Sequence, residues 1–205
     1  MHLDELIRWG GYFLLTAVVF AETGLLVGFC LPGDSLLVTA GLLAAVENSL
    51  NIYWLNLFLC LAAIIGDSVG YWIGCKIGPR IFTKEDSFIF NKAHITRTHL
   101  FFEKYGPKTL VLARFVPVVR TFAPTLAGVA GMNYKKFLSY NVVGGVAWVL
   151  SMTLLGYFLG RSIPDIEKKI HWVVLAVIFI SFLPILNEWN HERKLRASGK
   201  DQKKG

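Results

Sequence analysis

Two arginines lie six residues apart in a stretch that is otherwise apolar, Leu-Ala-Arg114-Phe-Val-Pro117-Val-Val-Arg120. A guanidinium at the centre of a bilayer costs at least about 3 kcal/mol, so it persists only beside an anionic partner. On an unbroken helix this spacing would point the two side chains to different faces, and a break at Pro117 lets them converge. Two planar guanidinium forks suit a phosphate better than two ammonium groups would, because each fork can bind two oxygens. Arg114 and Arg120 are therefore candidate ligands of an anionic substrate.

Three acidic residues, Glu22, Asp34 and Asp67, lie in or beside the other apolar stretches and are candidate partners of the arginines. One interpretation is a structural ion network, in which buried carboxylates and guanidiniums neutralise one another and nothing else binds. The other is a substrate site, in which Glu22 and Asp34 pair with the arginines in the empty state or carry protons. Asp67 is a further candidate for an ion pair. We favour the substrate site because the charges cluster at predicted helix breaks.

The apolar stretches are long enough to cross a membrane. The chain of 205 residues is 54% hydrophobic and only 17% charged, which is less charge than a soluble domain carries. A membrane span needs about 20 apolar residues. Stretches with at most one charge cover residues 10–31, 52–75, 137–160 and 170–187. The sequence therefore predicts an all-α, polytopic membrane protein with a single membrane domain over residues 1–190.

Prolines interrupt two of the apolar stretches. Proline inside a helix removes a hydrogen bond and forces a break, and broken backbone at membrane depth is tolerated only against protein or a water-filled cavity. We expect breaks at Pro32 and Gly33 in the first stretch, and at Pro117 and Pro124 in the second. Both stretches are interpreted as re-entrant helical hairpins, which enter and leave the membrane on one side.

A weak internal repeat accompanies the two hairpins. The sequence Gly70-Tyr-Trp-Ile-Gly74 recurs as Gly156-Tyr-Phe-Leu-Gly160, at an offset of 86 residues. Each unit would contain one hairpin and one full span, so a single crossing per unit places the second unit upside down relative to the first. Inverted repeats with discontinuous helices are typical of secondary transporters, whose sites lie at the interface of the repeats.

The repeat divides the chain into five expected segments. They are repeat 1 (about 10–78), an amphipathic basic loop (about 79–108), repeat 2 (about 109–163), an extra C-terminal span (170–187) and a basic tail (188–205). Residues 76–108 contain seven Lys and Arg against three acidic residues. By the positive-inside rule, the loop and the tail, and hence the C-terminus, face the cytoplasm.

Four short motifs contain these charged residues and most of the residues at predicted helix breaks. They are Phe20-Ala-Glu22-Thr-Gly24, Leu31-Pro-Gly-Asp34-Ser35, Gly66-Asp67-Ser-Val-Gly-Tyr71 and Ala113-Arg114-Phe-Val-Pro117-Val-Val-Arg120-Thr121. Together they resemble the DedA family, the bacterial branch of the SNARE-associated or VTT-domain membrane proteins, and within it the proteobacterial DedA subgroup. The resemblance runs from about residue 10 to residue 190.

The resemblance implies an inner-membrane protein with two facing re-entrant hairpins. It implies a role in returning a polyprenyl phosphate, chiefly undecaprenyl phosphate, across that membrane. Related members are tied to maintenance of the proton motive force and to phospholipid scrambling. The resemblance also implies that the functional residues are Glu22, Asp34, Arg114 and Arg120.

The leading hypothesis is a flippase for polyprenyl phosphate or another anionic lipid, in which Arg114 and Arg120 hold the phosphate and protons are possible partners. The alternatives are a proton-coupled antiporter for a small ion or drug, a phospholipid scramblase, a lipid phosphatase and a scaffold without transport activity. We expect no catalytic residue, cofactor or metal site, because no His, Cys or Ser has the spacing that such sites require. No nucleic-acid partner is expected, since no reading motif accompanies the basic segments. The lipid, the coupling ion, the direction and the oligomeric state stay open.

Overall fold

The computed structural model describes residues 3–24, 33–46, 50–83 and 105–162, and these ranges consist of helices and short turns. In chain order the helices are α1 (Leu3–Gly24), α2 (Gly33–Val46), α3 (Ile52–Thr83), α5 (Thr109–Ala113), α6 (Pro117–Val129) and α7 (Tyr134–Ser162). No strand occurs within these ranges. The predicted all-α architecture is confirmed for this part of the chain.

Several expected segments lie outside the described residues. They are Pro32, most of the basic loop, the C-terminal span over residues 170–187 and the tail over residues 188–205. Helix α3 continues to Thr83, beyond the boundary at residue 78 that was expected for repeat 1. That boundary followed the end of the apolar sequence, but a helix can continue into polar residues past its apolar part.

Helices α3 and α7 have the length and composition of membrane spans. Within Ile52–Lys76 and Tyr134–Ser162, an apolar stretch of 18 residues has a mean hydropathy of 1.7 and 1.9 respectively, and 33% of each stretch is buried inside the protein. The remaining positions are partly or fully exposed, and many of them are apolar, where a soluble protein would place polar side chains. Both helices are therefore suited to face lipid along most of their length.

Aromatic side chains mark the two ends of the apolar part of α3. Trp54 is 55% exposed and Trp72, 18 positions further along, is 53% exposed. These 18 positions span about 27 Å of helix, close to the ~30 Å hydrocarbon thickness of a bilayer. Exposed tryptophans at that separation are typical of the aromatic belts at the two membrane surfaces.

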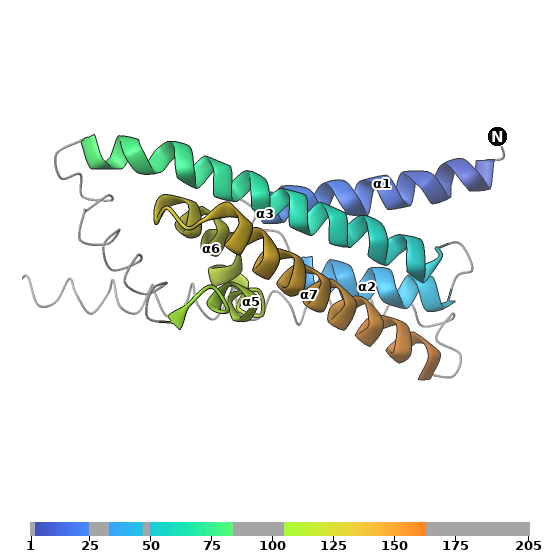
Figure 1. The fold of residues 1–205 in the computed structure, drawn as a ribbon. Helices are drawn as coiled ribbons and strands as arrows, with labels where there is room; N and C mark the ends of the chain where they lie inside the picture. Colours follow the sequence, from blue (N-terminus) through green and yellow to red (C-terminus); the bar gives the residue numbers. More distant parts are fainter. Residues whose placement is uncertain (1–2, 25–32, 47–49, 84–104, 163–205) are drawn as a thin grey trace, which may run out of the picture.

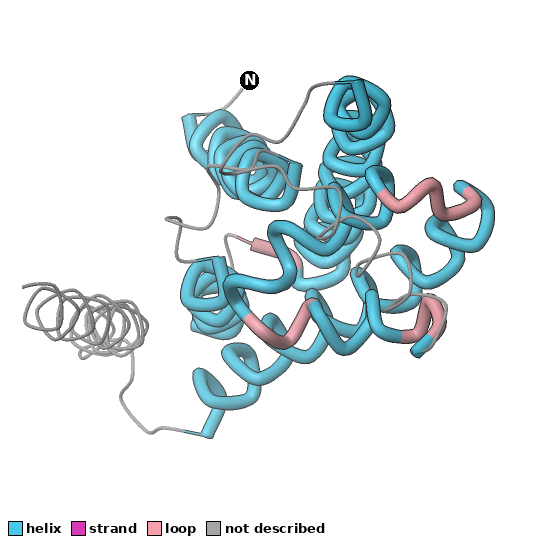
Figure 2. The backbone as a smooth tube through the Cα atoms, turned by 90° about the vertical axis from the view of Figure 1, so that its left-hand side faces the viewer, coloured by secondary structure: helices cyan, strands magenta, loops and turns pink. Residues whose placement is uncertain are grey.

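The two spans run past each other in opposite directions, and the shorter helices pack along them (Figure 1). Helix α2 packs mainly on α7, and helix α6 packs mainly on α3. Helix α1 also packs on α3, and the short α5 packs on α7. Figure 2 shows the same bundle turned by 90°, with several of its helices seen close to end-on. Helices α2 and α6 thus each pack chiefly on the span of the other predicted repeat.

Glycines allow very close contact between α2 and α7. A Cβ atom on Gly41 would lie 1.9 Å from the carbonyl oxygen of Thr153, and one on Gly156 would lie 1.9 Å from that of Val38. Real Cβ atoms do not approach backbone atoms so closely, so neither glycine can be replaced without separating the helices. Small residues at helix interfaces commonly allow such approach in membranes.

The same reciprocal contact recurs between α3 and α6. A Cβ atom on Gly74 would lie 2.1 Å from the carbonyl oxygen of Thr125, and one on Gly128 would lie 2.1 Å from that of Tyr71. In these contacts Gly74 of α3 corresponds to Gly156 of α7, whereas the sequence repeat aligned Gly70 with Gly156. The two alignments differ by one helical turn. The inverted orientation of the repeats stays a prediction, which these matched contacts support.

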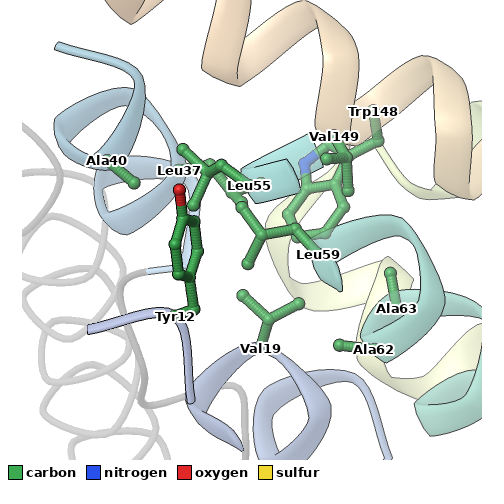
Figure 3. Packing of buried hydrophobic residues seen from close by; sticks show 10 residues of the cluster. All are labelled: Tyr12, Val19, Leu37, Ala40, Leu55, Leu59, Ala62, Ala63, Trp148 and Val149. Atoms are coloured by element: carbon green, nitrogen blue, oxygen red, sulfur yellow. The ribbon is translucent and has the colours of Figure 1, made fainter. Parts of the chain in front are cut away.

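The main hydrophobic core lies where α1, α2, α3 and α7 meet (Figure 3). Its buried side chains point toward one another and include Val19, Leu37, Leu55, Leu59 and Trp148. A second cluster joins α3 with α5, α6 and α7 and includes Tyr71, Leu110, Ala127 and Phe137. Of the charged residues singled out by the sequence, Glu22, Asp34, Asp67 and Arg120 lie in these helices, and Arg114 directly follows α5.

Candidate functional site

Arg120 lies in the first turn of α6 and forms ion pairs with two carboxylates. One is Glu22, near the end of α1, and the other is Asp34, in the first turn of α2. Arg120 and Glu22 are buried, whereas the side chain of Asp34 is 33% exposed. This group therefore joins the ends of three helices that are far apart in the sequence, and Asp34 is its most accessible member.

Trp148 of α7 also contacts the Arg120 group, and the sequence did not predict this contact. Its indole N–H donates a hydrogen bond of 2.8 Å to Oδ1 of Asp34, the oxygen that also accepts from Arg120. The Cζ atom of Arg120 lies 4.9 Å from the centroid of the Trp148 ring, within the range of a cation–π contact. The only sequence signal was a tryptophan in the middle of a charge-free span.

Gly33 provides space for the carboxylate of Glu22. A Cβ atom on Gly33 would lie 1.6 Å from Oε2 of Glu22 and 2.2 Å from its Cδ. Gly33 is not among the glycines with positive φ, which in the described residues are Gly106 and Gly131. The glycine that opens α2 is therefore required by the contact with Glu22 and not by a special backbone conformation.

Arg114 forms a separate group with Asp67 of α3 and Asn141 of α7. Its guanidinium donates to a carboxylate oxygen of Asp67 and to the amide oxygen of Asn141. The amide nitrogen of Asn141 donates in turn to the backbone carbonyl of Ile64, at 3.0 Å. All three side chains are buried. Asn141 was missed by the sequence analysis, although a lone amide in an apolar span is itself a signal of a buried polar contact.

The observed pairing differs in part from the expected one. Glu22 and Asp34 were expected to pair with both arginines in the empty state, but they pair with Arg120, while Arg114 pairs with Asp67. The difference arises from helix packing, because α3 and α7 present Asp67 and Asn141 to the end of α5.

A break between helices α5 and α6 separates the two arginines. Helix α5 ends at Ala113, Val116 is extended, and α6 begins at Pro117. Proline at the first helical position loses no intrahelical hydrogen bond, which explains why α6 can begin there. The prediction that Pro124 also forms a break is wrong, because Pro124 lies inside α6. Pro124 packs against α3, because a Cβ atom on Gly70 would lie 3.6 Å from Cβ of Pro124. Helix α6 therefore continues through Pro124 although the proline lacks one backbone hydrogen bond.

A small pocket lies between the two groups of charges, so both arginines reach one site. Its lining residues are Asp67, Leu110, Arg114, Arg120, Ala123, Pro124, Phe137 and Asn141. Asp67 lies five positions before Trp72 on α3, or about 7.5 Å along the helix. The pocket is therefore closer to the aromatic belt at Trp72 than to the one at Trp54.

The charges of the site do not balance. Three carboxylates against two guanidiniums leave one formal negative charge when all five groups are ionised. Oε2 of Glu22 and Nε of Arg120 are buried, and neither has a hydrogen-bond partner among the described residues. A buried network with one excess carboxylate and unpaired polar atoms is costly as a purely structural device. No group of three or more His, Cys, Asp and Glu in the described part of the chain could hold a metal ion.

The chain is similar to a known domain family and to several known proteins. The VTT domain matches residues 31–158, which is more than half of the chain. The Escherichia coli protein DedA is 43% identical over 205 residues, which cover 98% of this chain and 93% of that protein. The inner membrane protein YqjA of Escherichia coli is 40% identical over 152 residues, which cover 74% and 68%.

A further relative comes from Mycobacterium tuberculosis and is described by its name only as a membrane protein. It is 50% identical over 170 residues, which cover 82% of this chain and 74% of the relative. No solved structure matches the chain. The matched domain, the full-length similarity to DedA and the two apolar spans agree with one another, and the chain belongs to the DedA family of VTT-domain membrane proteins.

Proposed function

We propose that this protein is a flippase that returns a polyprenyl phosphate, undecaprenyl phosphate, across the bacterial inner membrane. In this proposal the chain is a multi-pass protein of that membrane with its basic loop and C-terminus in the cytoplasm. The phosphate binds Arg114 and Arg120, and the acidic residues occupy the guanidiniums when no lipid is present.

The observation that carries the proposal is that two buried arginines line one small pocket. Both guanidiniums bind carboxylate oxygens, which present charge and geometry similar to those of phosphate oxygens. Replacing a carboxylate by a phosphate therefore preserves the charge-assisted hydrogen bonds of the arginine. A site of this kind can exchange partners without leaving a guanidinium unpaired at any stage.

The excess negative charge supports a coupling to protons. The empty site already carries one formal negative charge, and a phosphate adds at least one more. Because unbalanced charge inside a membrane is expensive, a bound phosphate favours protonation of a released carboxylate. Glu22 and Asp34 are the candidates, since these two carboxylates share the single guanidinium of Arg120.

The surface beside the arginines is suited to the lipid tail. Exposed apolar side chains on the segment that carries the arginines are Leu112, Phe115, Val116, Val119 and Phe122. A polyprenyl chain can therefore stay in the bilayer against this surface while only the phosphate enters the pocket. The protein then needs a polar path for the headgroup alone.

A proton-coupled antiporter is the second candidate, and one observation favours it. Glu22 is buried, and its Oε2 has no partner among the described residues, as expected for an acid that exchanges protons during transport. The two functions differ in their ligand. An antiporter would move protons without binding a prenyl phosphate.

Transport of labelled undecaprenyl phosphate in proteoliposomes tests the proposal. We expect movement by the wild-type protein, loss of movement in Arg114→Ala, and near wild-type movement in Arg161→Ala. Arg161 is a matched control because it lies at the exposed end of α7, over the ring of Tyr157 and outside the pocket. Absence of movement in the wild type, or equal activity of both variants, would contradict the proposal.

A further inference from the structure

Asp34 differs from the other two acids of the site in having a second side-chain donor, which is neutral. It accepts from Arg120 and also from the indole N–H of Trp148, at 2.8 Å. Glu22 has Arg120 as its only side-chain partner among the described residues, and Asp67 has Arg114. Asp34 can therefore lose its arginine and still keep a hydrogen bond.

This second donor matters because the proposed transport requires Arg120 to change partners. A carboxylate left without a donor in a site of low dielectric is costly, and the cost would oppose binding of the phosphate. An indole N–H does not lose its proton under these conditions, and Trp148 is fully buried and lies in the main hydrophobic core. Trp148 is thus placed to hold Asp34 after Arg120 has left.

The ring of Trp148 acts on Arg120 as well. The guanidinium lies against the ring at 4.9 Å from Cζ to the centroid, so the ring favours a position of the charge that does not depend on the carboxylates. One side chain therefore contacts both partners of the ion pair that must separate. Neither contact requires the lipid to touch Trp148.

We propose that Trp148 is a positioning residue for lipid binding, which holds Asp34 and Arg120 apart from each other while Arg120 binds the phosphate. This inference rests on the proposed function for its role in transport, but the hydrogen bond to Asp34 can be tested without any lipid. A tryptophan that serves only as core packing would behave differently in both experiments below.

The first experiment measures how transport depends on lipid concentration. Trp148→Phe keeps an aromatic ring and removes the N–H. Both states lose this hydrogen bond, but only in the loaded state does Asp34 then lack any side-chain donor, so the mole fraction of undecaprenyl phosphate at half-maximal rate should rise about tenfold, with the maximal rate within about twofold of wild type. An unchanged half-saturation in a protein that transports the lipid would overturn the assignment.

The second experiment uses no lipid and separates the hydrogen bond from core packing. Arg120→Met removes the guanidinium without adding a donor, so it imitates the state in which Arg120 has left Asp34. Trp148→Phe should then lower the melting temperature in detergent about twice as much in the Arg120→Met protein as in the wild type. The lost packing is the same in both backgrounds and cancels, and the contact of the ring with Arg120 is weakened only in the wild type, so it cannot produce the expected excess. Equal losses would overturn the assignment, whatever the transport assay shows.

The two experiments also separate this inference from the proposed function. If the wild-type protein moves no prenyl phosphate, the proposed function fails, and the comparison of melting temperatures alone decides whether Trp148 holds Asp34. If the wild type moves the lipid and Trp148→Phe behaves as wild type in both assays, the proposed function stands and the role of Trp148 is wrong.

Discussion

Replacing Gly33 with alanine tests why a glycine opens α2. The new Cβ atom would lie 1.6 Å from Oε2 of Glu22, whereas ordinary contact begins near 3.4 Å. The carboxylate or the helix must therefore move by about 1.8 Å, which is enough to break a hydrogen bond to Arg120. Glu22 is 1% exposed, so the displaced carboxylate has no water to move into.

The expected cost follows from these distances. Overpacking a buried site typically costs about 1–3 kcal/mol. For a chain of this size, 1 kcal/mol corresponds to roughly 2–4 °C in melting temperature, so Gly33→Ala should lower it by roughly 2–12 °C. Transport should fall with it, because Arg120 loses a partner that sets its position. Thermal unfolding in detergent and the proteoliposome assay measure the two effects.

Two further variants make this prediction specific. Gly70→Ala is a matched control, since its Cβ would meet nothing closer than 3.5 Å, and we expect little loss of stability. Glu22→Ala should recover part of the stability of Gly33→Ala by vacating the space, without recovering transport. If Gly33→Ala were as stable and active as Gly70→Ala, the explanation from Glu22 would be refuted.

Three other predictions concern the charges, the packing and the topology. Glu22→Gln and Asp34→Asn should reach the membrane but lose transport, because the amide keeps the shape and removes the charge; near wild-type activity in both would return the acids to a structural role. Gly156→Ala should destabilise the protein by more than Gly70→Ala does, because its Cβ would lie 1.9 Å from the backbone oxygen of Val38; equal melting temperatures would contradict the close packing. A cysteine at Ser198 should react with a membrane-impermeant reagent only after the cells are opened, and labelling in intact cells would contradict a cytoplasmic C-terminus.

The helical architecture could be predicted from the sequence because it depends on local properties. The lengths of the apolar stretches predicted the spans that the structure shows as α3 and α7. Pro117 predicted a helix break between the arginines, and α6 begins at that residue. Pro124 was predicted wrongly, since its effect depends on how closely α6 packs against Gly70 of α3.

The composition of the site was predictable, but its pairing was not. The five charged residues stand out in an apolar sequence, since each needs a partner at membrane depth. Which carboxylate meets which arginine depends on the packing of α2 on α7 and of α6 on α3. Trp148 was missed because a tryptophan in a span resembles a packing residue until its hydrogen bond is seen. Asn141 signals a buried polar contact in the sequence, but only the structure identifies Arg114 as its partner.

The most direct test of the central claim is the binding of undecaprenyl phosphate by the two arginine-to-lysine variants. Lysine keeps the charge but loses the planar fork, so a phosphate site suffers more than a structural ion pair does. One charge-assisted contact is worth roughly 1.5–3 kcal/mol, so Arg114→Lys and Arg120→Lys should each bind the lipid about tenfold more weakly or worse. Lipid-dependent thermal stabilisation in detergent measures this binding, with Arg161→Lys as the control. We predict that, at the same lipid concentration, the lipid stabilises the wild type and the control more than either site variant, and equal stabilisation of all four proteins would show that Arg114 and Arg120 are not the phosphate site.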